Sequence, residues 1–186
     1  MPLKNTNNNT IIFTIMAILT HDEIIKRIDE GTIVIEPLDK KKIGPASIDL
    51  TLDKTFRVFK SLHTPIELSS DTFDVDSVSE IITVDKSITL QSGQAILGIT
   101  VEKVTLPPNI CGWIQGRSRF ARIGLMVHIS SSFIQPGISN KQVLELFNAG
   151  PISITIHPGI SICQVIFEET IGNASYTGKF QGQKSP

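Results

Sequence analysis

Gln142-Val143-Leu144-Glu145-Leu146-Phe147-Asn148 is a β-strand pattern with an acid at its centre. Because side chains alternate between the two faces of a strand, Glu145 shares one face with Val143 and Phe147, while the two leucines share the other. Glu145 is also the only carboxylate between residues 103 and 167. A carboxylate among core-type neighbours is costly to bury unless it is paired or functional. A structural Glu–Arg ion pair and a chemical role explain this acid equally well.

Short β-branched runs, separated by Pro, Gly, Asn or Asp, predict further strands on both sides of this stretch. They cover residues 33–36, 47–52, 56–59, 81–84, 88–90, 95–101, 110–114, 152–156 and 160–167. Many short strands at this spacing are typical of a sandwich, jelly roll or barrel. The sequence therefore predicts a mainly β fold.

Two short helices interrupt this pattern. Thr20-His21-Asp22-Glu23 has the form of a capping box, in which Thr20 caps the helix and Glu23 reaches back to it. Apolar residues follow at helical spacing, and we expect this helix to end near Gly31. The second helix is expected within residues 117–125, with Gly124 as its stop.

Composition limits the classes of partner. The chain has 186 residues, 40% of them hydrophobic, which is enough for one β domain with a real core. Its 17 Lys and Arg balance 18 Asp and Glu, so a nucleic-acid polymer is disfavoured as the main partner. An apolar run at residues 11–19 is too short to span a membrane. Residues 1–15 are Asn-rich, and we expect them to be a disordered or non-native extra segment before a β domain at 16–175.

The cysteines and histidines give no metal-site pattern. Cys111 and Cys163 lie in apolar strand-like runs, which predicts two reduced, buried thiols and a cytoplasmic protein. A zinc site is not expected, because there is no CxxC and no His/Cys cluster. The histidines are expected to be structural or exposed; they are His21, His63, His128 and His157.

Arg117-Ser118-Arg119-Phe120-Ala121-Arg122 is an unusual basic segment directly after a predicted strand. Arginine forks suit phosphate oxygens, and the start of a helix adds backbone N–H donors. A solvated basic face or ion pairs at a subunit interface would explain the same residues. Together with Glu145, the segment would supply an anchor for a polyanion and a proton-transfer group, the two parts that a nucleotide enzyme needs.

The C-terminal tail, residues 176–186, carries glycines, amides, lysines and two aromatic residues. This composition is compatible with a mobile lid that closes on phosphates. A frayed terminus is the alternative.

Four ordered motifs resemble those of the dCTP deaminase family, within the dCTP deaminase/dUTPase superfamily. Residues 116–125 resemble its Gly-Arg-Ser-Ser-x-x-Arg-x-Gly-Leu motif, and Ile134-Gln135-Pro136-Gly137 through Leu144-Glu145-Leu146 resemble its Ile-Asp-Pro-Gly…Leu-Glu segment. Pro45-Ala46-Ser47-Ile48-Asp49-Leu50 and Lys179-Phe180-Gln181-Gly182-Gln183 match its first and last motifs. The resemblance runs from about Met16 to Lys184.

The resemblance implies a distorted jelly roll, a β-clip barrel like that of dUTPases, assembled as a homotrimer with active sites between subunits. It implies a Mg²⁺–triphosphate substrate and deamination without zinc. Glu145 matches the general acid/base that activates water for attack on C4 of cytosine, and Arg122 and Ser118 match residues that position the water and the base. Substrate-binding roles are implied for Arg117, Arg119, Gln135, Gln164, Tyr176, Lys179 and Gln183.

Two positions depart from the family pattern. Arg119 replaces the second serine of the motif, and Gln135 stands where deaminases and dUTPases usually have Asp. An amide can bind the sugar but cannot take a proton near neutral pH, so the change affects diphosphatase chemistry more than deamination. The expected activity is deamination of dCTP to dUTP and ammonia. The alternatives are a dUTP diphosphatase, a bifunctional enzyme forming dUMP, and a non-catalytic trimer that binds deoxynucleoside triphosphates.

Overall fold

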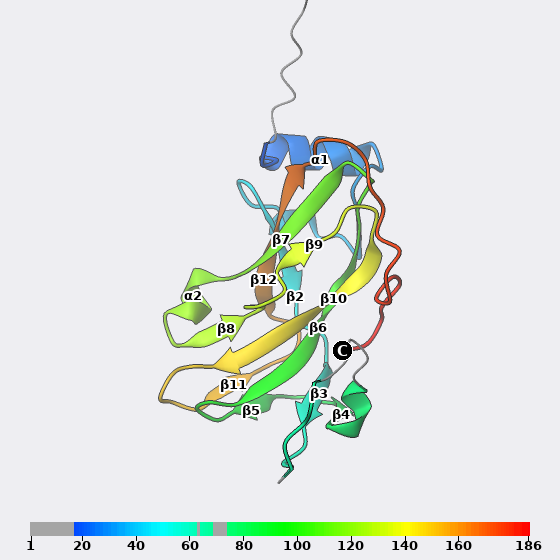
Figure 1. Ribbon diagram of the computed structural model, residues 1–186. Helices are drawn as coiled ribbons and strands as arrows, with labels where there is room; N and C mark the ends of the chain where they lie inside the picture. The colour runs from blue at the N-terminus through cyan, green and yellow to red at the C-terminus, as the bar shows by residue number, and fades with distance from the viewer. Residues whose placement is uncertain (1–16, 63, 69–73) are drawn as a thin grey trace, which may run out of the picture.

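Two antiparallel sheets enclose the core of the protein (Figure 1). The computed structural model describes residues 17–62, 64–68 and 74–186. The larger sheet has the order β4-β3-β6-β10-β8, with β1 also paired to β6, and the second has the order β2-β12-β7-β9. A two-stranded sheet of β11 and β5 lies beside them. The mainly β class predicted from the strand pattern is confirmed.

The larger sheet is formed by β1 (Val34–Glu36), β3 (Thr55–Phe59), β4 (Ser79–Thr83), β6 (Ala95–Thr105), β8 (Leu125–Val127) and β10 (Ser139–Asn148). The second sheet is formed by β2 (Ile48–Thr51), β7 (Ile110–Gly116), β9 (Phe133–Ile134) and β12 (Ser161–Glu169). The small sheet is formed by β5 (Ile88–Leu90) and β11 (Ile154–Ile156).

Strand β10 shows the expected alternation. Leu144 and Leu146 are fully buried and face the core, whereas Val143, Glu145 and Phe147 are only partly buried. The core between the sheets receives side chains from both of them, among them Phe56, Leu144, Val165 and Phe167. Glu145 is therefore held on the outer face of the larger sheet, and the core does not enclose it.

The helices lie where the sequence placed them. Helix α1 spans His21–Asp29, α2 spans Ser118–Ala121, and two short 3-10 helices, η1 and η2, cover Lys40–Lys42 and Val75–Ser77. The capping-box detail was wrong, because Thr20 makes no side-chain capping bond. The Glu23 carboxylate accepts hydrogen bonds from Arg27 and Lys26 instead.

Both cysteines are free and buried, as expected. Burial raises the pKa of the Cys163 thiol far above its ordinary value, so the thiol stays protonated. Within the described ranges, no helix combines the length and the apolar character that a membrane crossing requires. The expected segment of residues 1–15 and His63 lie outside the described residues.

Gly124 ends the α2 segment with a left-handed backbone, φ 86°, as its position predicted. A Cβ on Gly124 would lie 2.5 Å from the Gly150 nitrogen and 2.6 Å from its Cα. The Gly124 carbonyl also accepts a hydrogen bond from the Ala149 N–H at 2.8 Å. This close backbone contact joins the α2 segment to the end of β10.

Replacing Gly124 by Ala should lower the free energy of unfolding by about 3 kcal/mol or more, because a backbone clash adds to the left-handed strain. The matched control is Gly93→Ala, where φ is also positive (78°) but nothing lies within 4 Å of the added Cβ. The control should lose only about 1 kcal/mol. Urea unfolding measures the free energy of unfolding of both variants. Equal losses in the two would show that the backbone contact of Gly124 with Gly150 does not contribute to stability.

Candidate active site

The carboxylate of Glu145 is held by a turn that follows β8. Its Oε2 accepts hydrogen bonds from the backbone N–H groups of Ile129 at 3.1 Å and Ser130 at 2.9 Å. Its Oε1 accepts one from the Ser130 hydroxyl at 2.6 Å. None of the ion pairs in the described part of the chain includes Glu145. The structural alternative of a Glu145–Arg ion pair is therefore not found there.

These contacts decide the charge of Glu145. Partial burial raises the pKa of the carboxyl, but the Ser130 hydroxyl, the two backbone N–H groups and the nearby His128 together lower it below its ordinary value. Near neutral pH the group is therefore a carboxylate, ready to accept a proton and not to donate one.

His128 shapes the turn that holds Glu145. Its backbone is left-handed, φ 57°, an uncommon conformation for a residue with a side chain. The backbone N–H of His128 donates to the Glu145 carbonyl at 2.7 Å, and its Nε2 lies 2.6 Å from the Ser131 carbonyl oxygen. A carbonyl can only accept, so Nε2 carries the proton. Burial lowers the pKa of the ring, and the Nδ1 atom is buried with no partner in the described structure.

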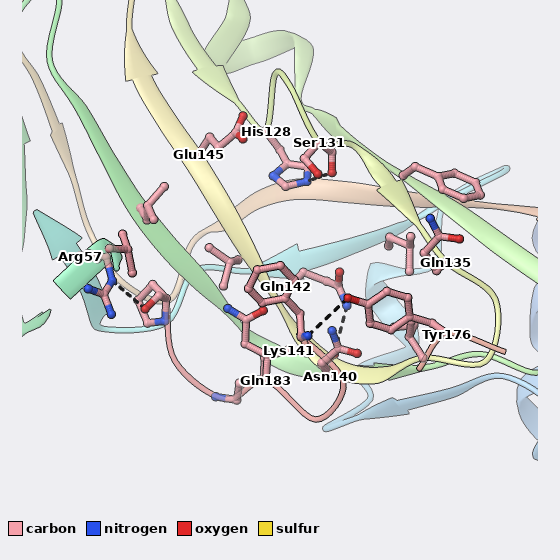
Figure 2. Close-up of a pocket in the computed structure, with 18 residues that line it drawn as sticks. Arg57, His128, Ser131, Gln135, Asn140, Lys141, Gln142, Glu145, Tyr176 and Gln183 are labelled. Carbon is pink, nitrogen blue, oxygen red and sulfur yellow. Dashed lines mark hydrogen bonds between the residues drawn. The ribbon is translucent and has the colours of Figure 1, made fainter. Parts of the chain in front are cut away.

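Glu145 and His128 line a cavity of about 570 Å³ on the outer face of the larger sheet (Figure 2). Three further residues singled out from the sequence line it as well: Gln135, Tyr176 and Gln183. A cavity of several hundred cubic ångströms, mostly apolar with a few converging polar groups, has the size and character of a small-molecule site. The structure thus brings together the acid, the residue before Pro136 and the C-terminal tail.

A second hollow, of about 470 Å³, gathers the basic residues. Arg117, Ser118, Arg119 and Gln164 line it, together with Ser47 and Asp49. The pairing of β12 with β2 and β7 explains this, because Gln164 lies opposite Asp49 on one side and Gln115 on the other. Four residues of the expected site therefore meet at the second sheet.

Hydrogen bonds and an ion pair fix this hollow. An Arg117 guanidinium nitrogen lies 2.9 Å from the Asp49 carboxylate, and another donates to the Ser161 carbonyl at 3.1 Å. The Ser47 hydroxyl donates to the Gln164 side-chain oxygen at 3.0 Å. The motif at residues 45–50 is therefore the partner of the arginine motif, which the sequence alone did not indicate.

Two predicted site residues line neither hollow. Arg122 is exposed at the C-terminal end of α2, and Lys179 is exposed, with its Nζ 6.0 Å from the centre of the Phe180 ring. Helix α2 and the C-terminal segment lie on opposite sides of the molecule in Figure 1. Within one chain the expected residues thus occupy separate places and do not form one continuous site.

Sequence reasoning missed two groups beside Glu145. His128 was expected to be structural or exposed, but it faces the cavity with an unpartnered ring nitrogen. Ser130 was not singled out, although its hydroxyl and N–H hold the acid. No local pattern marks either residue, because their roles come from the turn that carries the chain from β8 toward β9.

The two-sheet β fold thus carries a hydrogen-bonded carboxylate on the wall of one cavity and an arginine-lined hollow elsewhere, which are the features of a small-molecule site with an acid and an anion anchor. Residues 18–170 match the family model described as dCTP deaminase-like. The chain belongs to this family and is an enzyme, as the four motifs implied. The alternative of a non-catalytic binding protein is therefore not retained.

Two relatives and one solved structure illustrate the range of similarity. The dCTP deaminase of Marinomonas sp. (strain MWYL1) is 45% identical over 82% of this chain and 83% of the relative. A dUMP-forming dCTP deaminase of Methanosphaera stadtmanae is 35% identical over 92% of each chain. The structure of 2'-deoxycytidine 5'-triphosphate deaminase from Agrobacterium tumefaciens has a TM-score of 0.64 at 19% identity, covering 83% of this chain and 48% of that chain. This last likeness shows the shared fold, which confirms the predicted jelly roll.

Replacing Ser130 by Ala should raise the pKa of the Glu145 carboxyl, because the variant loses a hydrogen bond that stabilises the charged form. An NMR titration of the Glu145 carboxyl carbon measures this directly. Ser132→Ala removes a nearby hydroxyl that makes no bond to Glu145 and serves as the control. A Glu145 titration midpoint that stays in place or falls in the Ser130 variant would show that the hydroxyl does not set the charge.

Proposed function

We propose that the protein is a dCTP deaminase that converts dCTP and water to dUTP and ammonia. The observation that carries this proposal is Glu145, a hydrogen-bonded carboxylate without an ion-pair partner in the described structure, on the wall of a cavity of about 570 Å³. The relatives named above support it, since both are called dCTP deaminases.

Glu145 would act first as a base. Its lowered pKa keeps it ionised near neutral pH, so it can take a proton from a water molecule that attacks C4 of cytosine. Of the two protons of that water molecule, one would pass through Glu145 to the amino group, which departs as ammonia, and the other would end on N3 of the pyrimidine as C4 becomes a carbonyl. From the family resemblance, Arg122 and Ser118 would position the water and the base.

The phosphates would lie against the basic hollow. Arg117 and Arg119 offer guanidinium groups there, and Ser118 and Gln164 offer further hydrogen-bond partners. Lys179 and Gln183 from the tail would add contacts to the triphosphate, Gln135 would bind the sugar, and Tyr176 would fold over the nucleotide with the tail. Mg²⁺ would enter with the triphosphate as part of the substrate.

The reaction is proposed to be a zinc-independent hydrolysis. The sequence lacks the His-x-Glu…Pro-Cys-x-x-Cys pattern with which zinc deaminases hold their metal. The two cysteines are free and buried, which supports the proposed cytoplasmic location, where thiols stay reduced.

A homotrimer with active sites between subunits would join the two hollows. In one chain the acid and the arginines lie in different cavities, and Arg122 lines neither. A cyclic assembly repeats one interface, so each copy could place its arginine segment against the Glu145 cavity of the next. The partly exposed apolar side chains near Glu145, among them Met126, Ile129 and Phe133, support a subunit contact on this face.

A dUMP-forming reaction is the second candidate, favoured by the Methanosphaera stadtmanae relative, which carries that name. It requires hydrolysis within the triphosphate as well as deamination. Gln135 argues against it, because the amide in this cavity cannot take a proton from a second water near neutral pH. Formation of dUTP is therefore preferred.

Incubation with dCTP and Mg²⁺ should release ammonia and dUTP without pyrophosphate, and Glu145→Gln should slow ammonia release by about a thousandfold or more while sparing nucleotide binding. Glu80→Gln, an exposed acid on β4, is the control and should retain activity. Ammonia assays with chromatography of the nucleotides measure both products. Undiminished ammonia release in the Glu145 variant would refute the mechanism, and stoichiometric pyrophosphate would establish the dUMP-forming reaction instead.

A further inference from the structure

Several hydrogen bonds tie the C-terminal segment, residues 176–186, to the rest of the chain, and one of them joins the Gln181 side chain to the Gly137 carbonyl at 3.3 Å. The Tyr176 N–H donates to the Pro136 carbonyl at 2.9 Å, and the Gln183 carbonyl accepts from the Lys141 N–H at 3.2 Å. The Pro186 carbonyl accepts from the Arg57 side chain at 2.9 Å. The segment contains no helix or strand of its own and runs down past β10 to end beside β3 (Figure 1). Tyr176 packs against the core at the start of the segment, so the hydrogen bonds matter most for the part that follows it.

Arg57 lies in the same row of the sheet as Glu145. It pairs with Leu97 on β6, and Leu97 pairs with Glu145 on β10. Residues directly opposite in an antiparallel sheet share a face, so Arg57 and Glu145 lie on the same outer face, roughly 10 Å apart. Both line the cavity, as does Pro186. The cavity therefore extends from the acid at one end to this arginine at the other.

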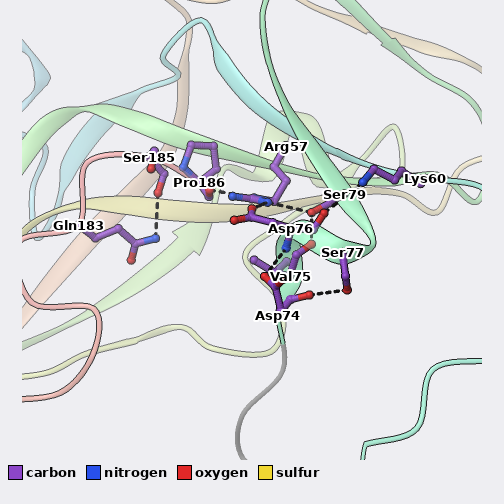
Figure 3. A network of polar contacts seen from close by, with 10 residues as sticks. All are labelled: Arg57, Lys60, Asp74, Val75, Asp76, Ser77, Ser79, Gln183, Ser185 and Pro186. Carbon is purple, nitrogen blue, oxygen red and sulfur yellow. Dashed lines mark hydrogen bonds and ion pairs between the residues drawn. The ribbon is translucent and has the colours of Figure 1, made fainter.

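The guanidinium of Arg57 is buried and held from two sides (Figure 3). One terminal nitrogen donates to the Asp76 carboxylate at 2.5 Å and to the Ser79 hydroxyl at 2.9 Å. The Nε–H points the other way and donates to the Pro186 carbonyl. The η2 segment thus fixes the arginine, and the arginine in turn fixes the tail.

An ordinary ion pair does not account for this arrangement. The Asp76 side chain is 75% exposed, and a pair with so exposed a partner contributes little stability. The buried guanidinium instead needs hydrogen-bond acceptors for its N–H groups, because burying them unpaired is costly. Pro186 is itself buried against it, so the tail supplies an acceptor where solvent is largely excluded. A charge-assisted bond in such a place is stronger than one between neutral groups.

We propose that Arg57 is a positioning residue that latches residues 176–186 over the cavity through the Pro186 carbonyl. By fixing the far end of the segment, it keeps Gln183 at the cavity wall, whereas Tyr176 is held at the near end by its own bond to Pro136 and by core packing. The latch acts in the protein without nucleotide, whereas its effect on catalysis rests on the proposed function. A tail that is docked before the nucleotide arrives costs less to order on binding. Loss of the latch reduces the fraction of molecules in which the tail is docked. The apparent nucleotide affinity falls by the same factor, with little effect on the chemical step.

Hydrogen exchange tests the latch in the absence of nucleotide. The Lys141 N–H reports docking, because its partner is the Gln183 carbonyl. In Arg57→Gln this amide should exchange roughly tenfold faster, as expected for loss of one charge-assisted hydrogen bond. Asp76→Asn is the matched control, since it removes the ion pair but leaves the Pro186 bond, and Arg57→Lys should fall between. Leu144, buried in the same strand, should stay protected in every variant. Faster exchange at Leu144 too, or equal effects of the Arg57 and Asp76 changes, would overturn the latch.

Steady-state kinetics with dCTP and Mg²⁺ test whether loss of the latch weakens nucleotide affinity. Arg57→Gln should raise KM about tenfold, with kcat within roughly twofold of wild type. If the substitution only destabilised the fold, the fraction of active enzyme and therefore the apparent kcat would fall instead. An unchanged KM, or a fall confined to kcat, would overturn the positioning role. Wild-type protein without deaminase activity would refute the proposed function instead, and the exchange experiment would still decide whether the latch exists.

Discussion

The alternation of strand β10 is the constraint on which the site depends. Because successive side chains point to opposite faces, two buried leucines oblige Glu145 to face outward, away from the core. The turn at residues 128–130 then supplies three hydrogen bonds that keep the acid ionised without an ion-pair partner among the described residues. Packing thus sets the direction of the carboxylate, and the turn sets its charge.

The two sheets divide the remaining functional groups. Pairing of β12 with β2 and β7 brings the arginine segment against Asp49 and Ser47, whereas Gln135 and residues of the tail gather around Glu145. A nucleotide is long enough to need both an anchor for its phosphates and a base beside its pyrimidine. In the proposed homotrimer, a neighbouring copy would supply the anchor. The fold of one chain would then position two half-sites.

The sequence was most informative where one residue contrasts with its surroundings. The strand pattern and the lone acid identified the class of fold, the position of β10 and Glu145. Strands β8 and β9 were missed because they are short and their pairing depends on β10 and β7. Arg57 was missed although it too is a charge within an apolar strand, between Phe56 and Val58. The bonds that hold Glu145, and the partner of the arginine motif, depend on contacts distant in sequence, which composition and spacing do not encode.

The central claim is that Glu145 of one copy works with the arginine segment of another. Subunit mixing tests it directly: Glu145→Gln and Arg122→Ala chains, each inactive alone, are unfolded together and refolded at equal amounts. If sites are shared, random cyclic assembly gives a wild-type acid opposite a wild-type arginine in about a quarter of the sites, and ammonia release should recover to that level. If each chain carries a complete site, the mixture will remain as inactive as its components.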